Sequence, residues 1–234
     1  MPDLEPQIAV PMMPGPMLHN MAMAPPTNLL INNDPKILES LVDKEETIEW
    51  ESTSERMKET TKLPHNLLKL LSGRWTASDT EDCPEPNLEV AANLTSPSSL
   101  EKIENEIEMA DLKCFKRLLV PRPRLVPLVR EMSNLWPKSS IQLSGMFLYP
   151  EGGGYMGWHT NSDSPCTRVY ISNVKEGGKS FFRYRLDGEY VTSWDKAGWN
   201  MRCFEVTKEN PMWHCVYAEE QRLSVGFRIN RNLL

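Results

Sequence analysis

Long apolar runs are absent from this chain of 234 residues, and cysteine is scarce. Without a run of about 18 apolar residues, no membrane-spanning helix is expected. The five cysteines are odd in number and never spaced as CxxC, which argues against a disulfide framework or a thiolate zinc site. The amino terminus lacks the basic and apolar segments of a secretory signal. We therefore expect an intracellular protein with no membrane contact.

Lysine and arginine are missing from residues 1–35, which contain six methionines and eight prolines. Proline disfavours both helix interiors and central strands. A segment of this composition buries too little apolar surface to offset the entropy lost on ordering. Residues 1–35 are therefore predicted to be a disordered tail.

The charges are distributed unevenly along the chain. Residues 1–110 carry 20 acidic and 8 basic residues, or −12, and residues 111–234 carry 12 and 18, or +6. Mutual neutralisation of the two halves is the simpler interpretation. The basic segment 113–130, which contains no acid, also suggests a nucleic-acid contact, although a solvated helix face is the commoner meaning of such a run.

Residues 36–140 are predicted to be a helical region. Apolar residues at helical spacing follow Pro35, and two further helices are expected at 63–71 and 100–119. The polar, proline-containing stretch 76–98 between these two helices is interpreted as a linker or long loop.

From Ile141 the apolar period changes to two, which is typical of strands. The gaps between the runs are too short for crossover helices, so the strands must pair antiparallel. Residues 141–234 therefore predict a mainly β domain, a sandwich or jelly roll. The eight strand-like runs are 141–149, 155–160, 167–172, 179–185, 189–194, 200–206, 212–217 and 222–229.

Two of the four histidines, His159 and His214, fall in this β region. Residues i and i+2 of a strand share a face, so Asn161 is expected to project with His159. Two histidines and one oxygen ligand on one face of iron leave positions open for a co-substrate and dioxygen. A buried, hydrogen-bonded histidine pair without metal is the competing interpretation.

The order of motifs resembles the 2-oxoglutarate/iron(II)-dependent dioxygenase superfamily. HTN (159–161), His214 and RLS (222–224) occupy the places of its HxD motif, its distal histidine and its RxS motif. GGKSFF (177–182) and AGWNMRCF (197–204) resemble connecting strands of the prolyl-4-hydroxylase-like branch. The likeness covers about residues 141–230.

Some features also resemble the AlkB-like demethylases and phage-encoded members of the superfamily. YMGWHTNSD is similar to the AlkB-like metal strand, and Arg222 and Arg228 are spaced like a paired-arginine motif. Ser224 and Gly226 replace its usual Asn and Thr.

The resemblance implies a double-stranded β-helix (jelly roll) core that binds Fe(II) and 2-oxoglutarate. Arg222 and Ser224 would bind the far carboxylate of 2-oxoglutarate, with Tyr149 as a further donor. Arg228 would be a second contact to the co-substrate or to the substrate. The implied reaction is hydroxylation or demethylation of a protein side chain, a nucleic-acid base or a small metabolite.

Asn161 departs from the family pattern, which has Asp or Glu at this position. Three interpretations compete: Asn161 ligates the metal through its oxygen, Asp163 supplies the carboxylate instead, or the site is degenerate. In the last case the domain is a non-catalytic module for binding or assembly. An anionic ligand offsets the charge of iron better than a neutral amide does, so this position decides between enzyme and binding module.

Overall fold

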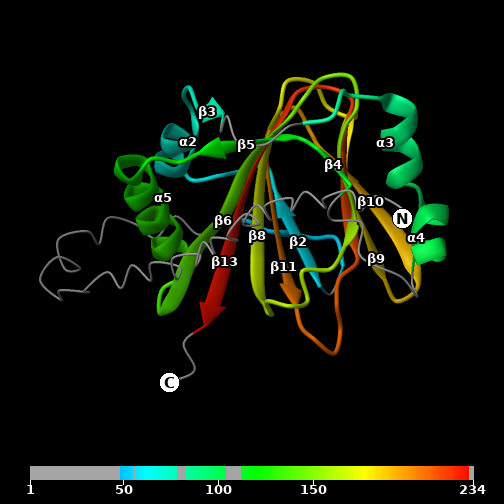
Figure 1. Cartoon of the computed structure of the whole chain (residues 1–234). Helices are drawn as coiled ribbons and strands as arrows, with labels where there is room; N and C mark the ends of the chain where they lie inside the picture. The colour runs from blue at the N-terminus through cyan, green and yellow to red at the C-terminus, as the bar shows by residue number, and fades with distance from the viewer. Residues whose placement is uncertain (1–47, 55, 78–82, 104–111, 232–234) are drawn as a thin grey trace, which may run out of the picture. The chain divides into compact units, whose positions relative to one another are not determined.

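Two antiparallel sheets form most of the structure, a computed structural model that describes residues 48–54, 56–77, 83–103 and 112–231 (Figure 1). The expected tail at 1–35 and the expected helix after Pro35 lie outside these residues. Residues 46–234 cluster as one unit. No helix in the described part of the chain is long and apolar enough to cross a membrane.

The larger sheet has the strand order β1-β2-β11-β8-β13-β6-β5-β3, and the smaller sheet has the order β10-β9-β12-β7-β4. From β6 onward the chain passes repeatedly between the two sheets, and every pair within each sheet is antiparallel. This is a double-stranded β-helix, so the predicted mainly β jelly roll is confirmed. The strands are β1 (Glu51–Ser52), β2 (Met57–Thr60), β3 (Thr76–Ala77), β4 (Lys113–Cys114), β5 (Lys116–Leu119), β6 (Ser139–Tyr149), β7 (Gly154–His159), β8 (Cys166–Val174), β9 (Ser180–Leu186), β10 (Glu189–Trp194), β11 (Gly198–Val206), β12 (His214–Ala218) and β13 (Arg222–Arg231).

The period of two assigns the side chains of β13 to two different environments. Val225, Phe227 and Ile229 pack in a core between the larger sheet and the helices α2 (His65–Leu71) and α5 (Arg122–Leu135). Arg222 and Ser224 alternate with them and are also buried. They therefore project from the opposite face, toward the space between the sheets.

Four helices accompany the sheets in the described part of the chain. In Figure 1, α2 and α5 lie beside β5 and β6, whereas α3 (Leu88–Leu94) and α4 (Pro97–Ile103) lie on the side of the smaller sheet. The predicted helix at 63–71 is confirmed as α2. Helix α5 forms despite Pro127, because Leu128 and Met132 on one face are fully buried.

Two predictions for the region before Ile141 were wrong. The stretch expected to be a linker contains α3, whose first turn is capped by the side chain of Asn87 accepting from the Val90 amide at 3.0 Å. Of the helix expected over 100–119, residues 100–103 belong to α4 and residues 104–111 lie outside the described residues, whereas residues 113–119 supply β4 and β5 instead. In this segment the pairing of β4 with β7 and of β5 with β6 outweighs the helical spacing of the apolar residues.

Candidate metal and co-substrate site

His159 and His214 are brought together at the ends of adjacent strands of the smaller sheet. His159 ends β7, His214 begins β12, and the two are direct partners across the ladder. Their ring centroids are 4.1 Å apart, and the residues are 5% and 0% exposed. The structure thus confirms that these two histidines, 55 positions apart in the chain, meet inside the jelly roll.

Each histidine has a backbone partner that determines its tautomer. The Nδ1 atom of His159 lies 2.9 Å from the Gly157 carbonyl oxygen, and that of His214 lies 2.8 Å from the Met212 carbonyl oxygen. A carbonyl oxygen only accepts, so each Nδ1 donates, and in the neutral form of each ring Nε2 is then the nitrogen without a proton. Burial, and then the neighbouring His159, hold the pKa of His214 well below its usual value. A neutral, backbone-oriented imidazole is the form that ligates metals.

Asn161 completes the group from the turn after β7. Its backbone has a φ of 56°, in the left-handed region that asparagine tolerates better than most residues. Its side-chain Nδ2 lies 3.2 Å from His214 Nε2 and 3.4 Å from the Tyr170 hydroxyl. Rotating the amide by half a turn puts Oδ1 in the same place. Adjacent ligands at about 2.1 Å from one metal lie about 3 Å apart, so this spacing suits a shared ion.

Asp163 does not join this group. It is exposed in the turn, and no cluster of three His, Cys, Asp or Glu side chains suited to a metal occurs among the described residues. The polar side chain beside the histidine pair is therefore the neutral amide of Asn161. Asn161 reaches it through the left-handed turn and not through strand alternation, because β7 has already ended at His159.

The glycine-rich loop between β6 and β7 packs closely against the start of α3. At Gly153 the φ is +120°, and a Cβ there would lie 2.7 Å from the backbone carbon of Asn87. Only glycine accommodates both the backbone conformation and the approach. This loop connects Tyr149, the last residue of β6, to β7, the strand that carries His159.

Arg222 lies at the start of β13, directly opposite Tyr149 of β6. It is 1% exposed, its guanidinium carbon is 5.5 Å from the centre of the Tyr149 ring, and its Nη1 is buried without a hydrogen-bond partner. Burial raises the pKa of Tyr149, so its hydroxyl stays protonated and able to donate. A buried cationic donor without an acceptor is costly, and an anionic ligand would relieve that cost.

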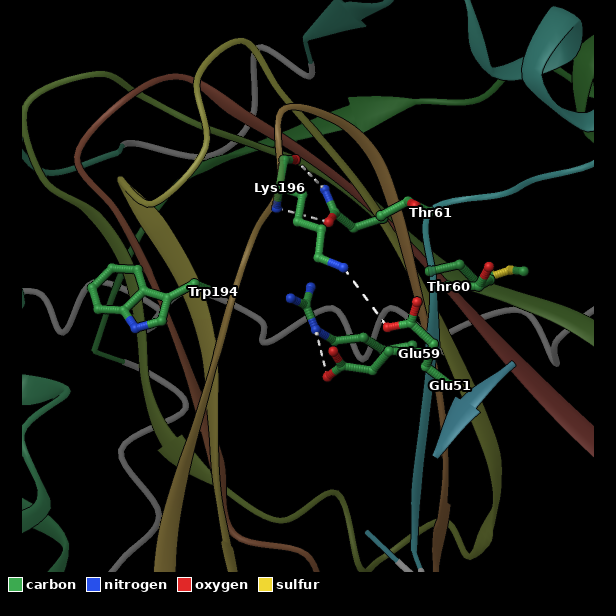
Figure 2. Close-up of a pocket in the computed structure, with 9 residues that line it drawn as sticks. Glu51, Glu59, Thr60, Thr61, Trp194 and Lys196 are labelled. Atoms are coloured by element: carbon green, nitrogen blue, oxygen red, sulfur yellow. Dashed lines mark hydrogen bonds and ion pairs between the residues drawn. The ribbon is translucent and has the colours of Figure 1, made fainter. Parts of the chain in front are cut away.

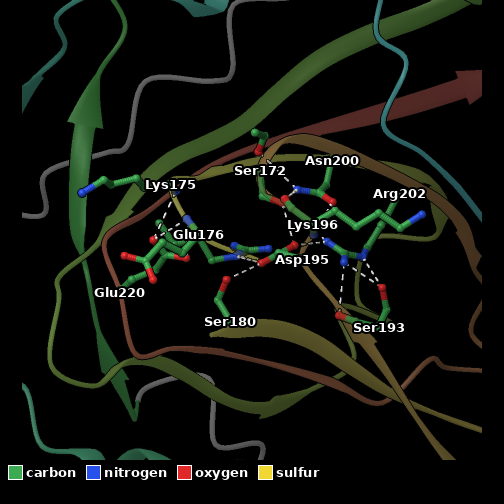
Figure 3. A network of polar contacts seen from close by, with 12 residues as sticks. Ser172, Lys175, Glu176, Ser180, Ser193, Asp195, Lys196, Asn200, Arg202 and Glu220 are labelled. Atoms are coloured by element: carbon green, nitrogen blue, oxygen red, sulfur yellow. Dashed lines mark hydrogen bonds and ion pairs between the residues drawn. The ribbon is translucent and has the colours of Figure 1, made fainter. Parts of the chain in front are cut away.

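The buried carboxylate of Asp195 binds the Nε edge of Arg222, and Figure 3 shows Asp195 among its other partners. Asp195 accepts from Arg222 Nε at 2.8 Å and from Arg202 Nη1 at 2.6 Å. Ser172 and Ser180 also donate to it, at 3.0 and 2.7 Å. Burial favours a higher pKa for Asp195, but the charges and hydrogen bonds of the two arginines outweigh it and hold the pKa well below the usual value.

A small pocket, which Arg202 helps to line, is shown in Figure 2. Its lining includes Glu59, whose Oε1 is 3.4 Å from Arg202 Nε, and the half-exposed Trp194. None of the residues predicted for the metal or the co-substrate lines it. Arg202 therefore connects this pocket to Asp195, whereas Arg222 connects Asp195 to Tyr149.

The remaining predicted residues, Ser224 and Arg228, follow Arg222 along β13. Ser224 is buried and pairs with Phe147 of β6 and Ser172 of β8. Arg228 is partly exposed and pairs with Arg168 of β8. Sequence reasoning missed Asp195, Arg202 and Arg168. The one sequence signal for these residues is a charged side chain at an inward-facing position within a strand or directly after it.

Among the solved structures to which the chain is similar, three match at a TM-score of 0.39. A Pseudomonas putida prolyl-4-hydroxylase is 16% identical, and the match covers 72% of this chain and all of that one. A Burkholderia pseudomallei oxidoreductase of the 2OG-Fe(II) oxygenase family is 13% identical over 65% and 95% of the two chains. A Trichoplax adhaerens prolyl hydroxylase, solved with a hypoxia inducible factor peptide fragment, is 13% identical over 70% and 87%. No protein-family model and no curated protein matches the chain.

Proposed function

We propose that this protein is an Fe(II)- and 2-oxoglutarate-dependent oxygenase. One observation carries the proposal. Two histidines with backbone-anchored Nδ1 atoms converge with the amide of Asn161, whose side chain lies 3.2 Å from His214 Nε2.

His159, His214 and the side-chain oxygen of Asn161 would hold the iron. Bound iron and 2-oxoglutarate together would supply the activation of dioxygen needed to oxidise a substrate C–H bond, with succinate and carbon dioxide as co-products. The protein orients the ligands and excludes water. The rings of Phe182 and Phe204, 5.1 and 5.6 Å from the His214 ring, make this end of the site apolar.

Arg222 would bind the far carboxylate of 2-oxoglutarate through its unpartnered Nη1. Asp195 holds the Nε edge, so the guanidinium is fixed in orientation before the co-substrate arrives. Tyr149, opposite Arg222 on the neighbouring strand, and Ser224, two residues along β13, are the further donors that we propose for this carboxylate. The oxidised substrate would be a protein side chain or a nucleic acid, hydroxylated or demethylated.

Anaerobic titration of the purified chain with iron(II) and 2-oxoglutarate tests the proposal. The wild type should develop a weak visible charge-transfer band that saturates with both components. His214→Ala should lose the band, and His65→Ala, at an exposed helical position, should retain it. A well-folded wild type without a band contradicts the proposal and leaves the non-catalytic binding module as the better interpretation.

Substituting Asn161 tests its assigned role directly. Asn161→Asp adds an anionic oxygen beside His214, so iron(II) should bind at least about tenfold more tightly, because a carboxylate offsets the charge of the ion. Asn161→Ala should weaken iron binding by about tenfold or more. If neither variant changes the dissociation constant for iron, Asn161 is not a ligand.

A further inference from the structure

Arg168 of β8 and Arg228 of β13 face each other as direct partners in the larger sheet. Arg168 is 1% exposed, and Arg228 is partly exposed. In both side chains Nε is buried and has no hydrogen-bond partner. Two cations placed directly opposite one another on antiparallel strands repel, so this pairing destabilises the sheet unless an anion compensates it.

No such anion is supplied by the described residues. The ion pairs formed within the described part of the chain include neither arginine. The cross-strand neighbours beyond the pair are uncharged, Phe204 next to Arg168 and Gln142 next to Arg228. Burial raises the pKa of Cys166, and the charges of Arg168 and Arg228 oppose that shift. Burial likewise raises the pKa of Tyr170, and the charges of the same two arginines oppose that shift.

The position of Arg168 is determined by the turn that carries Asn161. Its Nη2 donates to the backbone carbonyls of Ser164 at 3.0 Å and Asn161 at 3.4 Å. These contacts orient the guanidinium but leave Nε without an acceptor. The unmet donors therefore lie next to the turn whose asparagine side chain approaches His214 Nε2.

Arg228 and Arg222 belong to separate electropositive centres. They are six residues apart on β13, a separation of about 20 Å between Cα atoms at the usual rise. Arg222 is already paired with Asp195, which Arg202 also contacts. The pair Arg168–Arg228 has no corresponding carboxylate among the described residues.

We propose that Arg168 and Arg228 form an anion-binding subsite that holds a phosphate or carboxylate group of the substrate beside the metal ligands. Its place in catalysis rests on the oxygenase function proposed above, whereas binding of the anion requires no metal. Two guanidiniums with free donors suit an oxyanion, which accepts from several N–H groups at once. A substrate with such a group would be anchored close to Asn161.

Binding of inorganic phosphate to the metal-free full chain tests the subsite, measured calorimetrically and by thermal unfolding at constant ionic strength. The wild type should bind phosphate saturably and unfold at a higher temperature. Arg228→Gln and Arg168→Gln should weaken binding at least tenfold. Arg183→Gln is the matched control, because Arg183 is a part-buried arginine on β9 that hydrogen-bonds Thr192 and Thr95 instead.

Arg228→Gln decides the outcome if Arg168→Gln does not fold, because Arg228 is partly exposed. Equal phosphate binding by the wild type and Arg228→Gln, or no binding by the wild type, overturns the proposal. Competition between phosphate and 2-oxoglutarate in the iron-loaded protein also overturns it, because the subsite would then serve the co-substrate. Phosphate binding without 2-oxoglutarate binding supports the anion subsite and refutes only the oxygenase function.

Discussion

Asp195 is the acid that balances two of the three fully buried arginines of the jelly roll. Among the described residues, Arg168, Arg202 and Arg222 are at most 2% exposed, and Asp195 is the buried acid that accompanies them. It contacts Arg202 and Arg222 but not Arg168. Removing one member of a buried charge network leaves the other members uncompensated, which is why single substitutions here should be costly.

Asp195→Asn should lower the free energy of unfolding at pH 7 by about 3 kcal/mol or more. The folded pKa of Asp195 is depressed, so its ionised form stabilises the protein above the unfolded pKa of about 4. That stabilisation is lost as the pH falls from about 4 toward the folded value. Urea unfolding at several pH values should therefore show the difference between wild type and variant shrinking in acid.

Asp163→Asn is the matched control for this prediction, because Asp163 is exposed. It should unfold like the wild type at every pH. A difference for Asp195→Asn that stays constant down to pH 3 would show that packing, not charge, explains the effect.

The basic segment 113–130 forms β4, β5 and the start of α5 rather than one charged helix face. Arg124 within it is structural: it donates to the Arg74 carbonyl at 2.7 Å and stacks 3.4 Å from the centre of the Trp75 ring. Lys116 and Arg117 on β5 are exposed and remain available to an anionic partner. Binding of nucleic acid by this segment stays a prediction.

The salt dependence of DNA binding, measured by fluorescence anisotropy, tests that prediction. If the segment contacts phosphates, log K should fall linearly with log salt, and the double variant Lys116→Gln/Arg117→Gln should reduce the slope by about two. Lys175→Gln/Lys208→Gln, at exposed sites elsewhere, should leave the slope near its wild-type value. A flat salt dependence in the wild type excludes this role.

The larger sheet approaches the histidine pair of the smaller sheet through Tyr170. β7 and β12 of the smaller sheet carry His159 and His214, and Tyr170 from β8 of the larger sheet contacts both Asn161 and the His214 ring. A metal bound there would link the turn after β7 to β12. Because metal binding requires the folded arrangement, it should stabilise the entire domain.

Iron(II) at about 100 times its dissociation constant should add about 2.7 kcal/mol of stability. For a domain of this size that corresponds to a rise of roughly 5–10 °C in Tm. Anaerobic thermal scans should show the rise in the wild type and in His65→Ala, and none in His214→Ala. An unchanged wild-type Tm at saturating iron would contradict a metal site at the histidine pair.

Local pattern was sufficient to predict the β half of the chain. The period of two from Ile141 onward identified all eight strands of the jelly roll, and the short gaps required antiparallel pairing. Arg222 and Ser224 were singled out by the resemblance of RLS (222–224) to the RxS motif. These features depend on neighbours in the sequence, which is why they could be predicted without a structure.

Tertiary structure alone decided the surroundings of the site. The turn after β7, not strand period, brings the side chain of Asn161 to His214, and it leaves Asp163 exposed. Pairing across strands places Asp195 on Arg222 and Arg168 opposite Arg228. Contacts between residues distant in sequence depend on sheet register and on the cost of burying charge, which no local pattern encodes. The sequence by itself determined the jelly roll and singled out its two histidines, and the folded sheets determined which side chains those histidines meet.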